Sequence, residues 1–360
     1  MKLPDKLTHM EPYTPSVDHF DVKLDANENA VTVDEEAQAR ILEAISKVEL
    51  NRYPDPSAAA LRRAAAGVFG VRAENIGCGC GSDEIISILM NNFLSRGDTV
   101  VMSEFDFSMY AFYAHNAELR VVSVPTDDKL RINPDALLDA VRRSHAGMLI
   151  FSNPCNPTGQ GLPRDVVRRI IEKADCLVVV DEAYMDFWSQ SVADEVDEYD
   201  NLIVLRTCSK AYGLAAIRCG FLLANEKLVG YYDTVRSPYN VNSFTQAAGA
   251  AVLSDPEMTR RMAQACTQRA DSLRLMARGL CAEHAWYIDY IPTVTNFALL
   301  RPKAQGGWSA SYCYEQLKNR SIGVRLLKDE YLRITAGTDA ENSAVILALD
   351  GILTEWEESR

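Results

Sequence analysis

The sequence lacks a long apolar run, an excess of basic residues and a regular spacing of cysteines. No apolar run approaches the roughly 18 residues of a membrane-spanning helix, so we expect no membrane span. With 37 Lys and Arg against 50 Asp and Glu, the net charge of -13 argues against nucleic acid as the main partner, because phosphate backbones select basic surfaces. The nine scattered cysteines and the polar start at residues 1–7 predict free thiols and a cytoplasmic location.

Catalytic signatures of several enzyme classes are absent as well. There is no zinc-ligand spacing, no His-Glu-x-x-His and no Gly-x-Ser-x-Gly, which argues against a metal site or a hydrolase nucleophile. The five histidines lie outside the motifs described below, and we assign none of them a catalytic role.

What the sequence does contain is an alternation of short apolar runs and amphipathic stretches. The runs that suit buried strands are Thr99–Met102, Arg120–Val124, Gly147–Phe151, Leu177–Val180, Leu202–Leu205 and Cys219–Leu223. Apolar residues recur every three or four positions in Asp83–Leu94, Phe107–Asn116, Pro134–Ser144 and Pro163–Ala174. This alternation predicts an α/β domain with a mostly parallel sheet, whose ligands gather at the carboxyl ends of the strands.

The length of 360 residues and the changes in residue pattern along the chain predict more than one domain. Residues 1–30 are spotted with prolines and are interpreted as an N-terminal arm, and residues 31–254 as the large α/β domain. Residues 255–360 are predicted to form a smaller α+β domain, with a strand at Thr293–Leu300 and a last helix from Ala340.

The segment Thr207–Arg218 follows the apolar run Leu202–Leu205 and contains Lys210 in a turn of small residues. An amine becomes nucleophilic near neutral pH when it is desolvated or lies beside another cation. A lysine after a buried strand, with Arg218 further along the same turn, suits a Schiff base beside a bound phosphate. The alternative is an ordinary surface lysine.

The segment Ile76–Glu84 carries three alternate glycines ahead of a predicted helix. Glycines let the backbone approach a ligand, and the helix start offers free amide hydrogens, so the segment suits an anion such as a phosphate. It matches neither Gly-x-Gly-x-x-Gly nor Gly-Lys-Ser/Thr, which leaves a nucleotide-dependent oxidoreductase as a weak alternative. A turn with a Ser or Asp helix cap is the structural alternative.

Three more polar side chains follow or interrupt predicted strands. Asn156 belongs to the second of two Asn-Pro pairs that hold the chain rigid, which places it to donate to a ligand. Asp181 ends a buried strand and needs a cation or a donor, such as the protonated nitrogen of a heteroaromatic ring or a magnesium ion. Arg333, flanked by Leu and Ile, is expected to point at a carboxylate or to lie in solvent.

Taken together, these motifs resemble those of fold-type I pyridoxal-phosphate enzymes, and more narrowly those of histidinol-phosphate aminotransferases. The segments that carry the resemblance are Leu24–Asn29, Arg52–Pro56, Gly81–Ile86, Asn153–Gly159, Val180–Tyr184, Ser209–Leu214, Pro238–Ser243 and Leu332–Thr335. They cover nearly the whole chain in unbroken order. The resemblance implies the fold-type I architecture and a homodimer with shared active sites.

The resemblance also implies a role for each motif residue. Lys210 would form the Schiff base with pyridoxal 5'-phosphate and carry the proton, and Asp181 would keep the pyridine nitrogen protonated. Asn156 and Tyr184 would bond the ring hydroxyl. The other implied cofactor contacts are Ser209, Arg218, Ser82 and Asp83 at the phosphate, Phe107 on the ring and Tyr53 from the neighbouring subunit.

At the substrate, the resemblance implies that Arg333 binds the α-carboxylate or lies near the phosphate end, with Asn156 close by. Arg325 and Tyr13 match positions that contact the substrate phosphate. Four departures from the family pattern concern the substrate more than the cofactor. They are Ala30 after Asn-Glu-Asn, Cys80 in place of asparagine, Phe107 without the hydroxyl of a stacking tyrosine, and a short stretch at 325–333.

The expected activity is the interconversion of L-histidinol phosphate plus 2-oxoglutarate with imidazole-acetol phosphate plus L-glutamate, a step of histidine biosynthesis. Alternatives on the same fold are an aromatic-amino-acid aminotransferase and a threonine-phosphate decarboxylase. A remote alternative is a non-catalytic sensor that binds pyridoxal phosphate. Such sensors normally carry a DNA-binding domain, and no basic helix-turn-helix segment is visible before residue 30.

Overall fold

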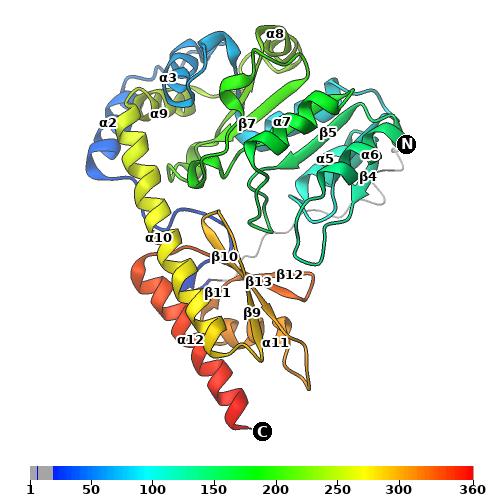
Figure 1. The fold of residues 1–360 in the computed structure, drawn as a ribbon. Helices are drawn as coiled ribbons and strands as arrows, with labels where there is room; N and C mark the ends of the chain where they lie inside the picture. Colours follow the sequence, from blue (N-terminus) through cyan, green and yellow to red (C-terminus); the bar gives the residue numbers. More distant parts are fainter. Residues whose placement is uncertain (1–5, 7–18, 360) are drawn as a thin grey trace, which may run out of the picture.

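The computed structural model describes residue 6 and residues 19–359. A seven-stranded sheet forms the centre of the larger lobe of the described chain (Figure 1). In spatial order its strands are β2 (Ile76–Cys80), β8 (Cys219–Ala224), β7 (Leu202–Thr207), β6 (Leu177–Asp181), β5 (Met148–Ser152), β3 (Thr99–Ser103) and β4 (Arg120–Val124). The strands from β7 to β4 run parallel to one another, and β8 runs antiparallel to both β7 and β2. The predicted α/β class with a mostly parallel sheet is confirmed.

The strands of this sheet are apolar on both faces, so helices cover both (Figure 1). On β5, Leu149 and Phe151 belong to one hydrophobic cluster, and Met148 and Ile150 belong to another on the opposite face. The first face is covered by α3 (Ala59–Phe69), α6 (Pro134–Ser144) and α7 (Arg164–Lys173). The second is covered by α4 (Gly81–Asn92), α5 (Met109–Asn116) and α8 (Glu226–Val235). Beside α3 lie α2 (Glu35–Ser46) and α9 (Ser243–Leu253).

The smaller lobe has its own sheet and hydrophobic cluster. Its antiparallel strands, in spatial order, are β12 (Arg325–Leu327), β13 (Tyr331–Thr335), β10 (Phe297–Pro302) and β9 (Ile288–Ile291). Its helices are α11 (Ala310–Lys318) and α12 (Asp339–Glu358), and β1 (Val22–Lys23) pairs with β11 (Ile322–Gly323). The chain before residue 31 therefore contributes a short strand to the smaller lobe.

One long helix, α10 (Pro256–Glu283), joins the two lobes (Figure 1). Near its start, Met258 and Cys266 pack in the cluster of the larger lobe. Further along, Leu273 and Leu280 pack in the cluster of the smaller lobe. The predicted domain boundary at residue 255 thus falls at the start of a helix that serves both hydrophobic clusters.

The six predicted strands and the four predicted helices of the larger lobe all form, with their ends displaced by at most a few residues. The segment Ile76–Glu84 was interpreted as a cradle or a turn, which is wrong for Ile76–Cys80 because these residues form strand β2, whereas the helix start expected after them begins at Gly81. Glycine is a poor strand former, but here it permits close packing. A Cβ atom on Gly79 would lie 2.5 Å from the side chain of Ile85, and one on Gly77 would lie 2.7 Å from the ring of Tyr232. Helices α2, α3 and α8 and strands β1 and β9 were not predicted.

The nine cysteines are all free, and only Cys80 is not buried. None of the helices in the described part of the chain is both long and apolar enough to cross a membrane.

The start of α4 lies directly on β8, and we predict that Gly220 is required there. A Cβ atom at residue 220 would lie 2.4 Å from the backbone of Gly81 and Ser82. Gly220→Ala should therefore lower the free energy of unfolding by about 3 kcal/mol, as measured by urea denaturation. Gly230→Ala, in α8, is the control: nothing lies within 4 Å of the added atom, and stability should rise by about 0.5–1 kcal/mol. Equal effects of the two substitutions would contradict this packing.

Candidate active site

A cavity of about 230 Å³ opens where the carboxyl ends of the parallel strands meet. This is the edge at which an open α/β sheet binds its ligands. The predicted site residues that line it are Ser82, Asp83, Phe107, Asn156, Asp181, Tyr184, Ser209, Lys210 and Arg218. Segments from five different strand ends are thus brought to one place. The cavity is also lined by Ala26, Glu28, Ser152 and Thr207, which the sequence analysis did not single out.

Asp181 ends β6 and is 4% exposed. Its carboxylate accepts hydrogen bonds from the Tyr110 hydroxyl (2.7 Å) and from the backbone amide of Ala183 (3.0 Å). Burial raises the pKa of Asp181 to about 6, and these two hydrogen bonds oppose that rise. A buried carboxylate that lines a cavity in this way is suited to accept a hydrogen bond from a protonated nitrogen of a ligand.

Lys210 lies in the turn after β7 and lines the same cavity as Asp181. Its ammonium lies over the ring of Tyr184, 5.6 Å from the ring centroid, within the range of a cation–π contact. Tyr184 is buried, and its hydroxyl oxygen accepts a hydrogen bond of 2.8 Å from the side-chain amide of Asn27. The lysine amine, the tyrosine hydroxyl and the aspartate carboxylate therefore face one small space.

Asn156 connects the two lobes. Its side-chain oxygen accepts a hydrogen bond from the guanidinium of Arg333, on β13 of the smaller lobe. Arg333 is 8% exposed and also donates to the backbone carbonyl of Asp25 (2.8 Å). Because the amide oxygen of Asn156 is already occupied, its NH₂ group is the part available to a ligand in the cavity. The guanidinium of Arg333 is thus buried and bonded to an amide and a backbone carbonyl, so the alternative of an arginine lying in solvent is wrong.

One end of the cavity is suited to an anion. The amides of Ser82 and Asp83 stand in the first turn of α4, where the helix dipole is positive. The guanidinium of Arg218 lies 3.1 Å from the Asp83 carboxylate, and a Cβ atom on Gly81 would lie 2.6 Å from that guanidinium. Ser209 is 9% exposed, and its hydroxyl accepts a hydrogen bond from Thr207. A side chain at residue 81 would displace the Arg218 guanidinium, so the glycine lets this cation lie against the start of α4.

The remaining predicted site residues lie around the cavity or away from it. Phe107 lines the cavity and meets the ring of Tyr110 edge-on, with 5.5 Å between centroids. Arg325 is half-buried and directly opposite Arg333 in the β12–β13 pair, so both side chains leave the same face of the sheet. Tyr53 is 80% exposed and stacks on Tyr239. The prediction for Tyr13 falls outside the described residues.

Sequence reasoning missed Asn27 and Tyr110 as parts of the site. Asn27 lies within the quoted segment Leu24–Asn29, but the alternation of polar residues there does not reveal which one points inward. Tyr110 follows Phe107 by one helical turn, and that i, i+3 spacing was a usable signal.

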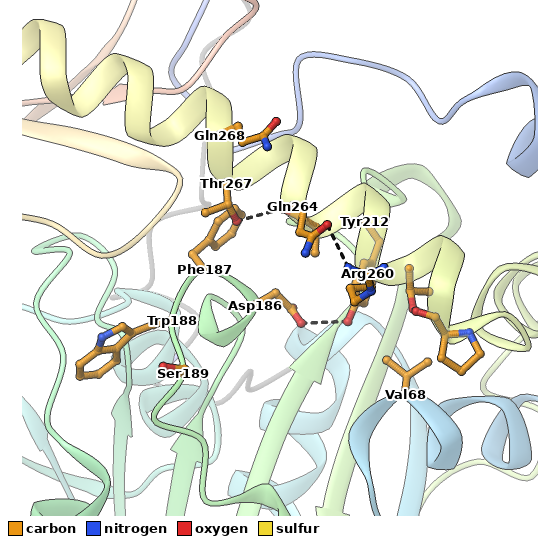
Figure 2. Close-up of a pocket in the computed structure, with 13 residues that line it drawn as sticks. Val68, Asp186, Phe187, Trp188, Ser189, Tyr212, Arg260, Gln264, Thr267 and Gln268 are labelled. Carbon is orange, nitrogen blue, oxygen red and sulfur yellow. Dashed lines mark hydrogen bonds between the residues drawn. The ribbon is translucent and has the colours of Figure 1, made fainter.

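A larger hollow, of about 840 Å³, lies between α10 and the segment after β6 (Figure 2). Asp186 and Tyr212 border it, and the Tyr212 hydroxyl donates to the Asp186 carboxylate at 2.8 Å. On the other side, Arg260 and Gln264 of α10 are bonded to each other (Figure 2). None of the predicted site residues lines this hollow, so the smaller cavity is the candidate active site.

The fold is that of a known class of enzymes. Residues 21–349 match the model of the family described as aminotransferase class I and II, and the chain belongs to this family. It is an aminotransferase.

Comparison with individual relatives narrows the class. The chain is 38% identical over 356 residues to the histidinol-phosphate aminotransferase of Clostridium kluyveri, covering 95% of this chain and 96% of the relative. It is 31% identical over 355 residues to that of Pyrococcus furiosus, covering 98% of both. A crystal structure of the Sinorhizobium meliloti histidinol-phosphate aminotransferase in complex with pyridoxal-5'-phosphate superposes with a TM-score of 0.84 at 25% identity, over 94% of this chain and 92% of that one. The chain is thus a member of the histidinol-phosphate aminotransferase group, and the resemblance seen in its motifs is confirmed.

The raised pKa of Asp181 predicts a pH dependence of stability in the protein without cofactor. Because the ordinary pKa of an aspartate side chain is 3.8 and the pKa of Asp181 in the folded protein is about 6, the folded state binds more protons between these values. The contribution of Asp181 to the free energy of unfolding is therefore fully present below about pH 4 and is lost as the pH rises through about 6.

The test compares urea denaturation of the wild type with that of Asp181→Asn, which does not titrate. The stability of the wild type relative to the variant should fall between pH 4 and pH 7. A difference that is constant or grows with pH would show that the carboxylate is not destabilised by burial.

Proposed function

We propose that this aminotransferase uses pyridoxal 5'-phosphate to interconvert L-histidinol phosphate plus 2-oxoglutarate with imidazole-acetol phosphate plus L-glutamate. The observation that carries the proposal is the placement of a buried carboxylate, Asp181, and an amine, Lys210, in one cavity whose far end is an anion cradle. Histidine biosynthesis is the corresponding pathway, and we propose a cytoplasmic location in keeping with the nine free cysteines.

The residues present fit the cofactor at each of its polar groups. Asp181 would accept a hydrogen bond from the protonated ring nitrogen, which favours the charged form of both partners. The NH₂ group of Asn156 and the hydroxyl of Tyr184 would meet the ring hydroxyl. Ser209, Arg218 and the amides of Ser82 and Asp83 would hold the phosphate, and Phe107 would stack on the ring. When bound, pyridoxal phosphate supplies an electron-accepting ring that stabilises negative charge at the α-carbon of the substrate.

Lys210 is the proposed attachment point and proton carrier, and Tyr184 and Asp181 are its catalytic partners. The 5.6 Å between the amine and the Tyr184 ring keeps the lysine at the cavity wall, where it reaches both the cofactor and a substrate carbon by rotation about its own side chain. The buried surroundings exclude water from that proton transfer.

The substrate phosphate is proposed to lie near Arg325, with Arg333 beside it and with Tyr13 and Asn156 as further contacts. Two arginines that leave the same face of adjacent strands provide a bidentate site for a phosphate or a carboxylate. The same pair would hold the carboxylate of glutamate in the other half of the reaction.

A homodimer is proposed because Tyr53 and Tyr239 stack on each other and together leave an aromatic pair exposed at the surface. The side chain of Tyr53 is 80% exposed, and the neighbouring Tyr239 is 44% exposed. Tyr53 would reach the phosphate cradle of the second copy, so that each site is completed by both subunits.

Lys210→Ala should abolish cofactor attachment. The absorption of the Schiff base at roughly 410–430 nm should be absent after addition of pyridoxal phosphate, and transamination should fall by about 10²–10⁴-fold or more. Lys227→Ala, at an exposed position of α8, is the control and should leave both unchanged. A variant at residue 210 that keeps the absorption band would refute the assignment.

Arg325→Ala should weaken the binding of phosphorylated substrates more than that of other substrates. Loss of a charged hydrogen bond to phosphate should raise the KM for histidinol phosphate about 10- to 100-fold, with a smaller effect on glutamate. Arg301→Ala on β10, which β13 separates from the strand of Arg325, is the control. Two results would replace the proposed substrate: a wild type that prefers phenylalanine points to the aromatic-amino-acid enzyme, and carbon dioxide release from threonine phosphate points to the decarboxylase.

A further inference from the structure

A second buried carboxylate, Asp106, lies beside the site and has no part in the chemistry described above. It follows β3 in the chain and is 9% exposed. The sheet order places β5 between β3 and β6, so Asp106 and Asp181 flank the end of β5 from opposite sides. A carboxylate that is buried at the edge of a functional site must be compensated by its hydrogen bonds.

The hydrogen bonds of Asp106 converge on a single residue of β5. Its two carboxylate oxygens accept from the backbone amide of Ser152 (3.0 Å) and from the hydroxyl of Ser152. A third bond, from the amide of Phe107 (2.8 Å), lies within its own turn. The titratable groups around it are Tyr110 on α5, Cys155 after β5 and Asp181 on β6, and none of them is a cation. Asp106 is thus held by neutral donors, chiefly Ser152.

Ser152 also bonds the backbone of Asn156, which links Asp106 to the turn after β5. The serine hydroxyl donates to Asp106 and accepts a hydrogen bond from the backbone amide of Asn156 (3.2 Å). The side chain of Asn156 is fixed from the other lobe by Arg333. The turn that carries Asn156 is therefore anchored at its backbone by Asp106 and Ser152, and at its side chain by Arg333.

We propose that Asp106 is a positioning residue: through Ser152 it fixes the turn after β5 so that the NH₂ group of Asn156 faces the cofactor ring hydroxyl. The inference rests on the proposed function, since it assigns Asn156 to that hydroxyl. A plain structural cap would stabilise the fold without influencing how tightly the cofactor binds. Asp106 should do both, because its chain of bonds ends at a cofactor contact.

The test is a double-mutant cycle on the dissociation constant for pyridoxal phosphate, measured by fluorescence titration of the protein freed of cofactor. Burial raises the pKa of Asp106 to about 7, so the titrations are made at pH 8, where its carboxylate is ionised. Asp106→Asn and Ser152→Ala should each weaken binding about 5- to 10-fold, the effect of one hydrogen bond. In the background of Asn156→Ala, either change should have less than about a 2-fold effect, because the contact that it positions is gone.

Asp34→Asn is the matched control, because Asp34 also caps a backbone amide, that of Ala37 at the start of α2, and does not line the cavity. It should leave the dissociation constant unchanged whatever it does to the unfolding temperature. If Asp106→Asn does not fold, Ser152→Ala carries the test, since it removes the hydroxyl and keeps the backbone bond. Equal weakening with and without Asn156, or no weakening in folded variants, overturns the positioning role alone. A wild type that binds no pyridoxal phosphate overturns the proposed function and this inference together.

Discussion

The burial of the Asp181 carboxylate is the constraint on which the site depends. Taking a carboxylate out of water is unfavourable, and the Tyr110 hydroxyl and the Ala183 amide compensate it only in part, as the raised pKa shows. The hydrophobic strands on either side keep water away from this position. A ligand that brings a protonated ring nitrogen completes the compensation, and the same interaction makes the ring a better electron acceptor. The buried carboxylate thus lowers the stability of the protein without ligand, and it is available to bind a protonated nitrogen when a ligand is present.

The second theme is that the site belongs to both lobes. Arg333 comes from the smaller lobe and bonds Asn156 of the larger one, and Asn27, just after β1, bonds Tyr184. Residues 22–24 are held in the smaller lobe because Leu24 bonds backbone groups of that lobe on both sides. A shift of one lobe against the other would therefore move groups that line the cavity. The geometry couples the relative position of the lobes to the arrangement of the candidate site.

The sequence predicted the parts of this molecule that depend on local pattern. The apolar runs identified the parallel strands, and the residues immediately after them, Asn156, Asp181 and Lys210, line one cavity as expected. The sequence-based predictions failed where the structure depends on packing between distant segments. The glycines of β2 suggested a loop, because the sequence does not show that they let the side chains of Ile85 and Tyr232 pack against the strand. Asp106 and Asn27 could not be identified, since nothing in the pattern shows which polar residue a distant segment will bury.

The most direct test of the account is to locate the lysine that carries the cofactor. The protein is incubated with pyridoxal phosphate, reduced with borohydride so that the bond to the lysine becomes permanent, digested and examined by peptide mass spectrometry. The account predicts one modified position, Lys210, in the segment between β7 and β8. Modification at another lysine, or none after reduction, would contradict it.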